Sequence, residues 1–166
     1  MIAILHADKE WGIGKKNDLM FNLPTDMKFF RETTTGKVVC MGYNTLLSFP
    51  NSKPLKNRTN IVLCEDDKNP ENCIAVHSVE ALLNECKKYK KDEVFIIGGA
   101  TVYRLMLPYC DAVYLTKVDA IGHADTFFEN LDEHPNFELV SQSEPINDNG
   151  INITFTVYKN NKVLEY

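Results

Sequence analysis

The fold class is decided by the stretch EVFIIGGATVYRLML, residues Glu93–Leu107. Its apolar run Val94–Ile97 is typical of a strand buried on both faces of a sheet. Two glycines follow at once, and Ala100–Leu107 then has the pattern of a helix that Pro108 ends. A strand followed by a glycine turn and a helix predicts a parallel sheet. The glycines Gly98-Gly99 also let another backbone or a pyrophosphate approach, although a tight turn without a ligand explains the local pattern equally well.

The same alternation of strand and helix extends to both sides of this stretch. Further strands are predicted at Ile2–Ala7, Lys37–Gly42, Arg58–Cys64 and Asp111–Val118, and helices at Pro24–Thr34, Tyr43–Phe49 and Val79–Tyr89. Phe137–Ser143 and Ile151–Tyr158 have the pattern of an antiparallel pair. We therefore expect an α/β fold in a single domain over residues 1–166. It should have a central, twisted, mainly parallel sheet with an antiparallel C-terminal edge and about four flanking helices.

Composition and charge exclude several classes of protein. The 166 residues carry a net charge of −5, which gives a nucleic-acid partner no overall electrostatic support. No apolar run approaches the ~20 residues of a membrane span. The five cysteines contain no CxxC pair, and the four histidines lack metal-ligand spacing. We therefore expect a cytoplasmic protein with reduced thiols and no metal, and by default a monomer.

A carboxylate begins the helix within FNLPTDMKFF, residues Phe21–Phe30. Pro24 suits the first turn of a helix, and helical spacing places Asp26 on the same face as Phe30. A carboxylate among apolar side chains costs free energy unless hydrogen-bond donors reach it. The simpler alternative is a solvated acid that the helix dipole favours. The apolar neighbours of Asp26 favour a ligand that brings donors to it.

Three further features are ambiguous from the residues alone. Asp8–Asp18 contains a lone Gly-Ile-Gly, which is a weak phosphate signal and also typical of a flexible turn or a lid. Gly42 ends a predicted strand before a helix, where backbone N–H groups can meet phosphate. Arg58 is either a solvated cation or the bidentate partner of a carboxylate. Ligands of open sheets bind beyond the carboxyl ends of the strands, where Gly42, Cys64 and Gly98 are expected.

Short motifs follow one another along nearly the whole chain. They are Trp11–Gly14 with Asn17, Leu23-Pro24 with Asp26 and Phe30, Val39–Gly42 with Thr45 and Ser48, Pro54-Leu55 with Arg58 and Asn60–Leu63, Ile97–Gly99 with Val102-Tyr103, Leu115-Thr116, and Asp125-Thr126 with Phe128. In this order and spacing the chain resembles the dihydrofolate reductase family. The resemblance implies that a hydride passes from NADPH to C6 of 7,8-dihydrofolate, which gives tetrahydrofolate for one-carbon metabolism and thymidylate synthesis.

The resemblance also implies a set of site residues. Asp26 would be catalytic and accept hydrogen bonds from the pterin 2-amino group and N3, supported by Thr116, and Arg58 would hold the glutamate α-carboxylate. The implied substrate pocket comprises Ile4, Leu5, His6, Asp26, Met27, Phe30, Ser48, Phe49, Leu55, Arg58, Ile97, Tyr103 and Thr116. The implied cofactor site comprises His6, Ile13, Gly14, Asn17, Leu19, Gly42, Tyr43, Asn44, Thr45, Leu63, Cys64, Glu65, His77, Ile97, Gly98, Gly99, Ala100, Thr101, Val102 and Tyr103. Residues 9–22 would form a mobile loop, and antifolates such as trimethoprim or methotrexate would be inhibitors.

The chain departs from the family pattern where the 2′-phosphate of NADPH would bind. Tyr43, Glu65 and Thr101 stand where the family often has cationic or hydroxyl residues. Arg binds phosphate through charge-assisted hydrogen bonds, and a carboxylate repels it. The preference for NADPH over NADH is therefore open, and NADH is a candidate cofactor. The nearby cations that could substitute are Lys53, Lys68 and His77.

Two departures concern the pterin end of the site. His6 stands where the family usually has Ala, at a position that acts mainly through its backbone, so we expect altered packing and unchanged chemistry. Phe21 replaces the more common Trp, which keeps an aromatic wall but removes the indole donor.

Two alternative functions remain open from the sequence. A pterin or flavin-precursor reductase on the same fold would keep the cofactor glycines without needing Arg58. A non-catalytic nucleotide-binding module would need only the turns at Gly42 and Gly98-Gly99, and it leaves Asp26 unexplained. The presence of both Asp26 and Arg58 favours folate.

Overall fold

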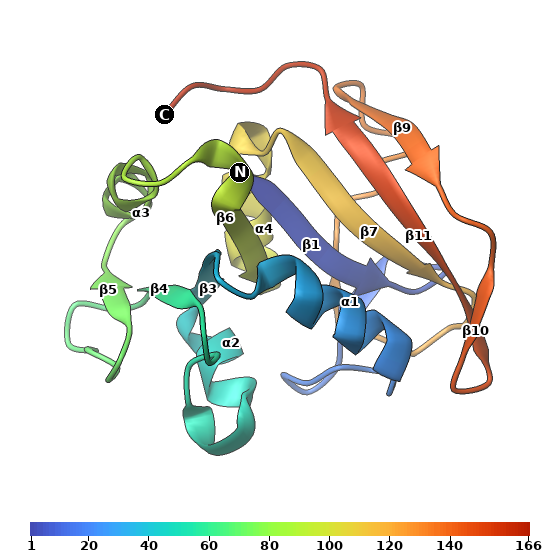
Figure 1. The fold of residues 1–166 in the computed structure, drawn as a ribbon, viewed down its shortest axis with the longest axis horizontal. Coiled ribbons are helices and arrows are strands. Elements are labelled where there is room, and N and C mark those ends of the chain that lie inside the picture. Colours follow the sequence, from blue (N-terminus) through green and yellow to red (C-terminus); the bar gives the residue numbers. More distant parts are fainter.

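The computed structural model describes all residues, 1–166, as a large sheet with helices on both faces (Figure 1). The strands are β1 (Ile2–Ala7), β2 (Gly12–Gly14), β3 (Val38–Gly42), β4 (Thr59–Leu63), β5 (Ile74–Val76), β6 (Val94–Gly98), β7 (Ala112–Val118), β8 (Thr126–Phe127), β9 (Phe137–Gln142), β10 (Ile146–Asp148) and β11 (Ile151–Asn160). The helices are α1 (Pro24–Thr34), α2 (Tyr43–Ser48), α3 (Val79–Cys86) and α4 (Ala100–Met106). Not one of these helices is both long and apolar enough to span a membrane.

The main sheet is parallel except at its C-terminal edge. Its strands follow the order β10-β11-β7-β1-β6-β3-β4-β5, with β9 also paired to β11. The pairs formed by β7, β1, β6, β3, β4 and β5 are all parallel. β11 runs antiparallel to β7, β9 and β10. The predicted α/β fold with an antiparallel C-terminal edge is confirmed.

The helices divide between the two faces of the sheet, as the view in Figure 1 shows for α1 in front and α4 behind. Phe30 of α1 and Leu46 of α2 pack on one face, in a cluster that includes Ile4 of β1. Leu82 of α3 and Met106 of α4 pack in the cluster on the other face. Successive side chains of a strand point to opposite faces, so His6 lies on the same face of β1 as Ile4, beneath α1.

Several short elements differ from the prediction. The sequence patterns did not indicate β5, β8 or β10, because strands of two or three residues are too short to show a period. The interpretation of Gly12–Gly14 as a flexible turn is wrong, since β2 pairs with β8. A Cβ at Gly12 would lie 2.5 Å from that of Ala124, so this glycine permits close packing. Helix α3 ends at Cys86, three residues before the predicted end at Tyr89.

Candidate active site

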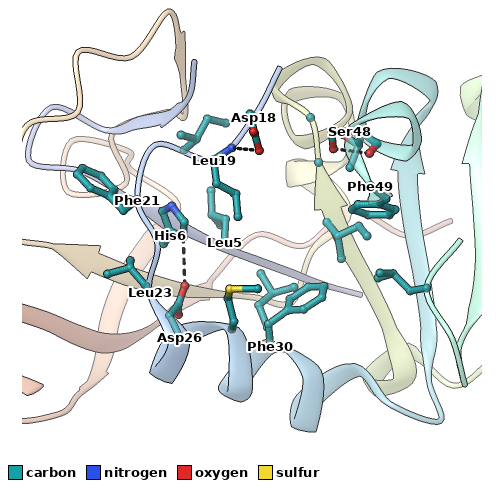
Figure 2. A pocket seen from close by; sticks show the side chains of 18 of the residues that line it. Leu5, His6, Asp18, Leu19, Phe21, Leu23, Asp26, Phe30, Ser48 and Phe49 are labelled. Carbon is teal, nitrogen blue, oxygen red and sulfur yellow. Dashed lines mark hydrogen bonds and ion pairs between the residues drawn. The ribbon is translucent and has the colours of Figure 1, made fainter. Parts of the chain in front are cut away.

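A cavity of about 720 Å³ lies beside α1, at the carboxyl ends of β1 and β6 (Figure 2). Its walls come from β1, the loop before α1, α1 itself, α2 and the turn between β6 and α4. Leu19 and Met27 line it and are 57% and 51% exposed. Large apolar side chains exposed together in a concave site are typical of a ligand pocket.

The cavity gathers most of the residues that the sequence analysis selected. The selected residues in its lining are Ile4, Leu5, His6, Ile13, Asn17, Leu19, Asp26, Met27, Phe30, Thr45, Ser48, Phe49, Leu55, Arg58, Ile97, Gly98, Gly99, Ala100 and Tyr103. The selected residues outside the lining are Gly14, Gly42, Tyr43, Asn44, Leu63, Cys64, Glu65, His77, Thr101, Val102 and Thr116. Phe21, which was expected to form an aromatic wall, also lines the cavity, and the lining residues that were not selected are Asp18, Leu23, Phe29, Arg31, Pro50 and Thr126.

Asp26 is buried at the cavity's edge in the first turn of α1. Its side chain is 13% exposed, and its Oδ1 accepts a hydrogen bond of 2.7 Å from the hydroxyl of Thr116 on β7. No residue of α1 or its N-cap position provides a side-chain cap. The carboxylate of Asp148, the last residue of β10, instead accepts bonds of 3.0 Å from the amides of Thr25 and Asp26. This cap, distant in sequence, fixes the backbone that carries Asp26.

His6 also contacts Asp26, which the sequence analysis did not anticipate. The Nδ1 atom of His6 lies 3.1 Å from Oδ2 of Asp26, and the His6 side chain is 7% exposed. The side chain of His6, and not only its backbone, therefore contacts the site carboxylate, while the expectation of unchanged chemistry at position 6 stays a prediction. The strand register explains the contact, because His6 lies directly opposite Thr116 in the parallel pair β1–β7. Both side chains thus point toward α1, where Asp26 lies.

Two guanidinium groups line another part of the same cavity. Arg58 is half-buried, and its Nη1 and Nε donate to Thr34 Oγ1 at 3.1 Å and to the carbonyl of Lys56 at 2.9 Å. Burial, together with the charge of nearby Arg31, lowers the pKa of Arg58. The sequence analysis missed Arg31, although its position one helical turn after Met27 was a usable signal. Two neighbouring cations in a cavity suit an anionic group of a ligand.

The glycine turns at the ends of β3 and β6 lie against each other. A Cβ on Gly42 would lie 3.1 Å from Val102 Cγ2 and 4.0 Å from the amide nitrogen of Gly99. Gly98 has φ +129°, a conformation that side chains rarely adopt. Helices α2 and α4 start here without a side-chain cap, so their first amides remain available. These residues fit the phosphates of a dinucleotide.

The loop before α1 is tied to neighbouring segments. The Lys16 amide donates to Oδ2 of Asp125 at 2.9 Å, and the Asp125 amide donates to the carbonyl of Gly14 at 3.1 Å. The bond from Lys16 lowers the pKa of the Asp125 carboxyl. On the other side, Asn17 Nδ2 donates to the carbonyl of Asn44 at 3.0 Å. These contacts hold the loop beside both the cavity and α2.

The residues that depart from the family pattern lie around the ends of β3, β4 and β6. Glu65 is exposed just after β4, and the amide of Lys68 donates to its carbonyl at 2.9 Å. The ring of His77 lies beside the same strand end, with Nδ1 3.1 Å from the carbonyl of Cys64. Tyr43 and Thr101 lie in the first turns of α2 and α4. Two basic residues are therefore neighbours of the exposed Glu65: Lys68 follows it closely in the chain, and His77 contacts the residue before it.

Comparisons with known proteins agree with this geometry. A sequence profile described as dihydrofolate reductase matches residues 1–160. The dihydrofolate reductase of Bacillus subtilis is 36% identical, over 96% of this chain and 94% of that protein. The bifunctional dihydrofolate reductase-thymidylate synthase 1 of Arabidopsis thaliana is 35% identical, and the match spans 94% of this chain but only 33% of that relative.

A solved structure gives the same result at the level of the fold. The dihydrofolate reductase from Enterococcus faecalis, complexed with NADP(H) and RAB-propyl, superposes with a TM-score of 0.86 and 33% identity. The match covers 96% of this chain and 95% of the other. The chain belongs to the dihydrofolate reductase family.

Proposed function

We propose that the protein reduces 7,8-dihydrofolate to tetrahydrofolate with NADPH, and that Asp26 binds the pterin. The observation that carries the proposal is the buried carboxylate of Asp26 at the edge of a largely apolar cavity, where Thr116 holds one of its oxygens. Hydrogen bonds to a carboxylate are strengthened where water is scarce. The amino group and ring N–H of a pterin offer two parallel donors to such a carboxylate.

Asp26 orients the ring and favours its protonation. Hydride transfer to the C=N bond of dihydrofolate is easier once N5 carries a proton, and a negative charge beside the ring stabilises that protonated form. The carboxylate binds the edge of the pterin opposite N5, so the proton reaches N5 through water. Leu19 and Phe21 of the loop line the cavity and limit the access of further water to the ring.

The cofactor would lie along the adjacent glycine turns. NADPH, when bound, supplies the hydride. Gly42 and Gly98-Gly99 would place the first amides of α2 and α4 against its phosphates, and Ile13, Asn17 and Leu19 of the loop would cover its nicotinamide end. The protein's own contribution is alignment of the two reactants and exclusion of water.

The two guanidinium groups favour folate over the alternative substrates. Arg58 would hold the α-carboxylate of the glutamate tail, with Arg31 as a second cation in the same cavity. A pterin or flavin precursor without an anionic tail would leave both cations without a ligand partner. A non-catalytic nucleotide-binding module would leave Asp26 without a use as well.

The substitution Asp26→Asn tests the proposal. We expect kcat/KM for dihydrofolate, followed by loss of nicotinamide absorbance, to fall by roughly 10²–10⁴ at neutral pH. The loss should shrink at acid pH, where solution already protonates the substrate. The matched control is Asp92→Asn, which changes an exposed carboxylate outside the cavity and should have wild-type activity. A pH profile that Asp26→Asn leaves unchanged would refute the role given to Asp26.

We further propose that residues 1–166 form one domain that acts as a cytoplasmic monomer and binds antifolates such as trimethoprim or methotrexate. All five cysteines are free, which suits a reducing compartment. The main sheet includes strands from both ends of the chain, which supports a single folding unit. Light scattering on the purified protein, with and without trimethoprim, measures the oligomeric state, and a dimer would contradict the proposal.

A further inference from the structure

The imidazole of His6 is a buried polar side chain of the site that the proposed mechanism leaves unused. It lines the cavity, and Figure 2 shows its ring directed at the carboxylate of Asp26. Its Nδ1 is 3.1 Å from Oδ2, while its Nε2 is buried and has no hydrogen-bond partner. We propose that His6 is a positioning and specificity-determining residue, which orients Asp26 when neutral and opposes cationic ligands when protonated. The inference rests on the proposed function, because it concerns ligands that bind Asp26.

The positioning role follows from the hydrogen-bond capacity of a carboxylate. Each carboxylate oxygen has two lone-pair sites. Thr116 takes one site on Oδ1, and His6 takes one on Oδ2, so one site on each oxygen remains for a ligand. Donors on both oxygens also prevent the carboxylate from rotating. The two free sites are then held as a pair, which matches the amino group and ring N–H of a pterin or a 2,4-diaminopyrimidine.

The specificity role follows from the charge of the pair. When the neutral ring of His6 carries its proton on Nδ1, that N–H donates to the carboxylate of Asp26, and the pair carries one negative charge. Protonation at Nε2 makes the pair neutral, so a cationic ring no longer meets a net negative charge. A cationic ligand and the second proton of His6 therefore compete for the same carboxylate.

The surroundings of His6 contain no other strong partner for it. The ring of Phe21 lies beside it, with ring centroids 6.2 Å apart, and Thr116, opposite His6 on β7, donates its hydroxyl to Asp26. The other charged side chains in the cavity lining are Asp18, Arg31 and Arg58. Two other buried carboxylates, those of Asp8 and Asp148, already accept hydrogen bonds from backbone amides. Asp8 accepts from the amides of residues 10, 12 and 122, and Asp148 accepts from those of residues 25 and 26. Asp26 is thus the carboxylate that responds to the charge of His6.

Two substitutions separate the roles. His6→Asn keeps a donor near the place of Nδ1 but cannot titrate, whereas His6→Ala removes the donor and the charge. At pH 8, we expect kcat/KM for dihydrofolate to stay within about threefold of wild type in His6→Asn and to fall at least about tenfold in His6→Ala. Equal losses in both variants would overturn the positioning role. Thermal unfolding of each variant establishes that it is folded.

Proton linkage tests the specificity role. Calorimetric titration with trimethoprim, in buffers of different ionisation enthalpy at pH 6, measures the protons exchanged on binding. We expect wild type to release more protons than His6→Asn, by up to one per ligand, and its affinity to fall faster with decreasing pH, by at most about tenfold per unit. The same proton exchange in both proteins would overturn this role. If neither protein binds trimethoprim nor oxidises NADPH with dihydrofolate, the proposed function itself fails, and this inference fails with it.

Discussion

Replacing Arg58 with leucine should weaken folate binding without damaging the fold. Breaking a buried charge pair costs roughly 2–5 kcal/mol. Arg58 is only half-buried and Arg31 remains in the cavity, so we expect the lower limit, about 2 kcal/mol, or a roughly 30-fold rise in Kd. The fold should be little affected, because the Thr34 hydroxyl that Arg58 contacts also donates to the carbonyl of Phe30 at 2.8 Å.

The assay compares two ligands on the same variant. Fluorescence titration with folate, which has the glutamate tail, should show the loss, whereas trimethoprim, which has no carboxylate, should bind as to wild type. Arg104→Leu is the matched control, since it removes an exposed guanidinium outside the cavity. Equal losses for folate and trimethoprim would show that the substitution disturbs the pocket as a whole. An unchanged Kd for folate would mean that Arg58 is a solvated cation.

Two further substitutions test the loop and the cofactor choice. Gly12→Ala should destabilise the protein by about 1–3 kcal/mol in urea unfolding, because the new Cβ would lie 2.5 Å from that of Ala124 and 2.9 Å from a carboxylate oxygen of Asp8. Wild-type stability would mean that the loop moves aside easily. If Glu65 faces the 2′-phosphate, Glu65→Gln should raise kcat/KM for NADPH relative to NADH by up to about fivefold, the effect of ~1 kcal/mol between exposed charges. An unchanged ratio would place Glu65 away from that phosphate.

The sequence was a good guide to the elements and a partial guide to the site. The runs that became β1, β3, β4, β6 and β7 are apolar because a parallel sheet is covered on both faces. The glycines Gly42 and Gly98-Gly99 can be read directly from the sequence, and their position at the ends of strands follows from the alternation of strand and helix. Local signals of this kind depend on residues within a few positions of one another.

The cavity residues that the sequence analysis missed depend instead on contacts between distant segments of the chain. Arg31 lies on the same helix as Asp26, but only the approach of the segment before β4 makes it a neighbour of Arg58. The unselected lining residues include Phe29 of α1 and Thr126 of β8, which lie about a hundred residues apart in the chain. No periodicity within one segment indicates which other segment will face it.

Asp26 shows most clearly which features the sequence predicts and which depend on the tertiary structure. The sequence by itself determined that a carboxylate begins α1 beside apolar residues, since Pro24 and the helical spacing are local. Only the tertiary structure decided its partners, because the register of β1 against β7 brings His6 and Thr116 to it from 20 and 90 residues away. Asp148 caps the same turn from 122 residues away. Register and helix docking depend on how the whole core packs, so the hydrogen-bond partners of Asp26 could be identified only in the folded chain.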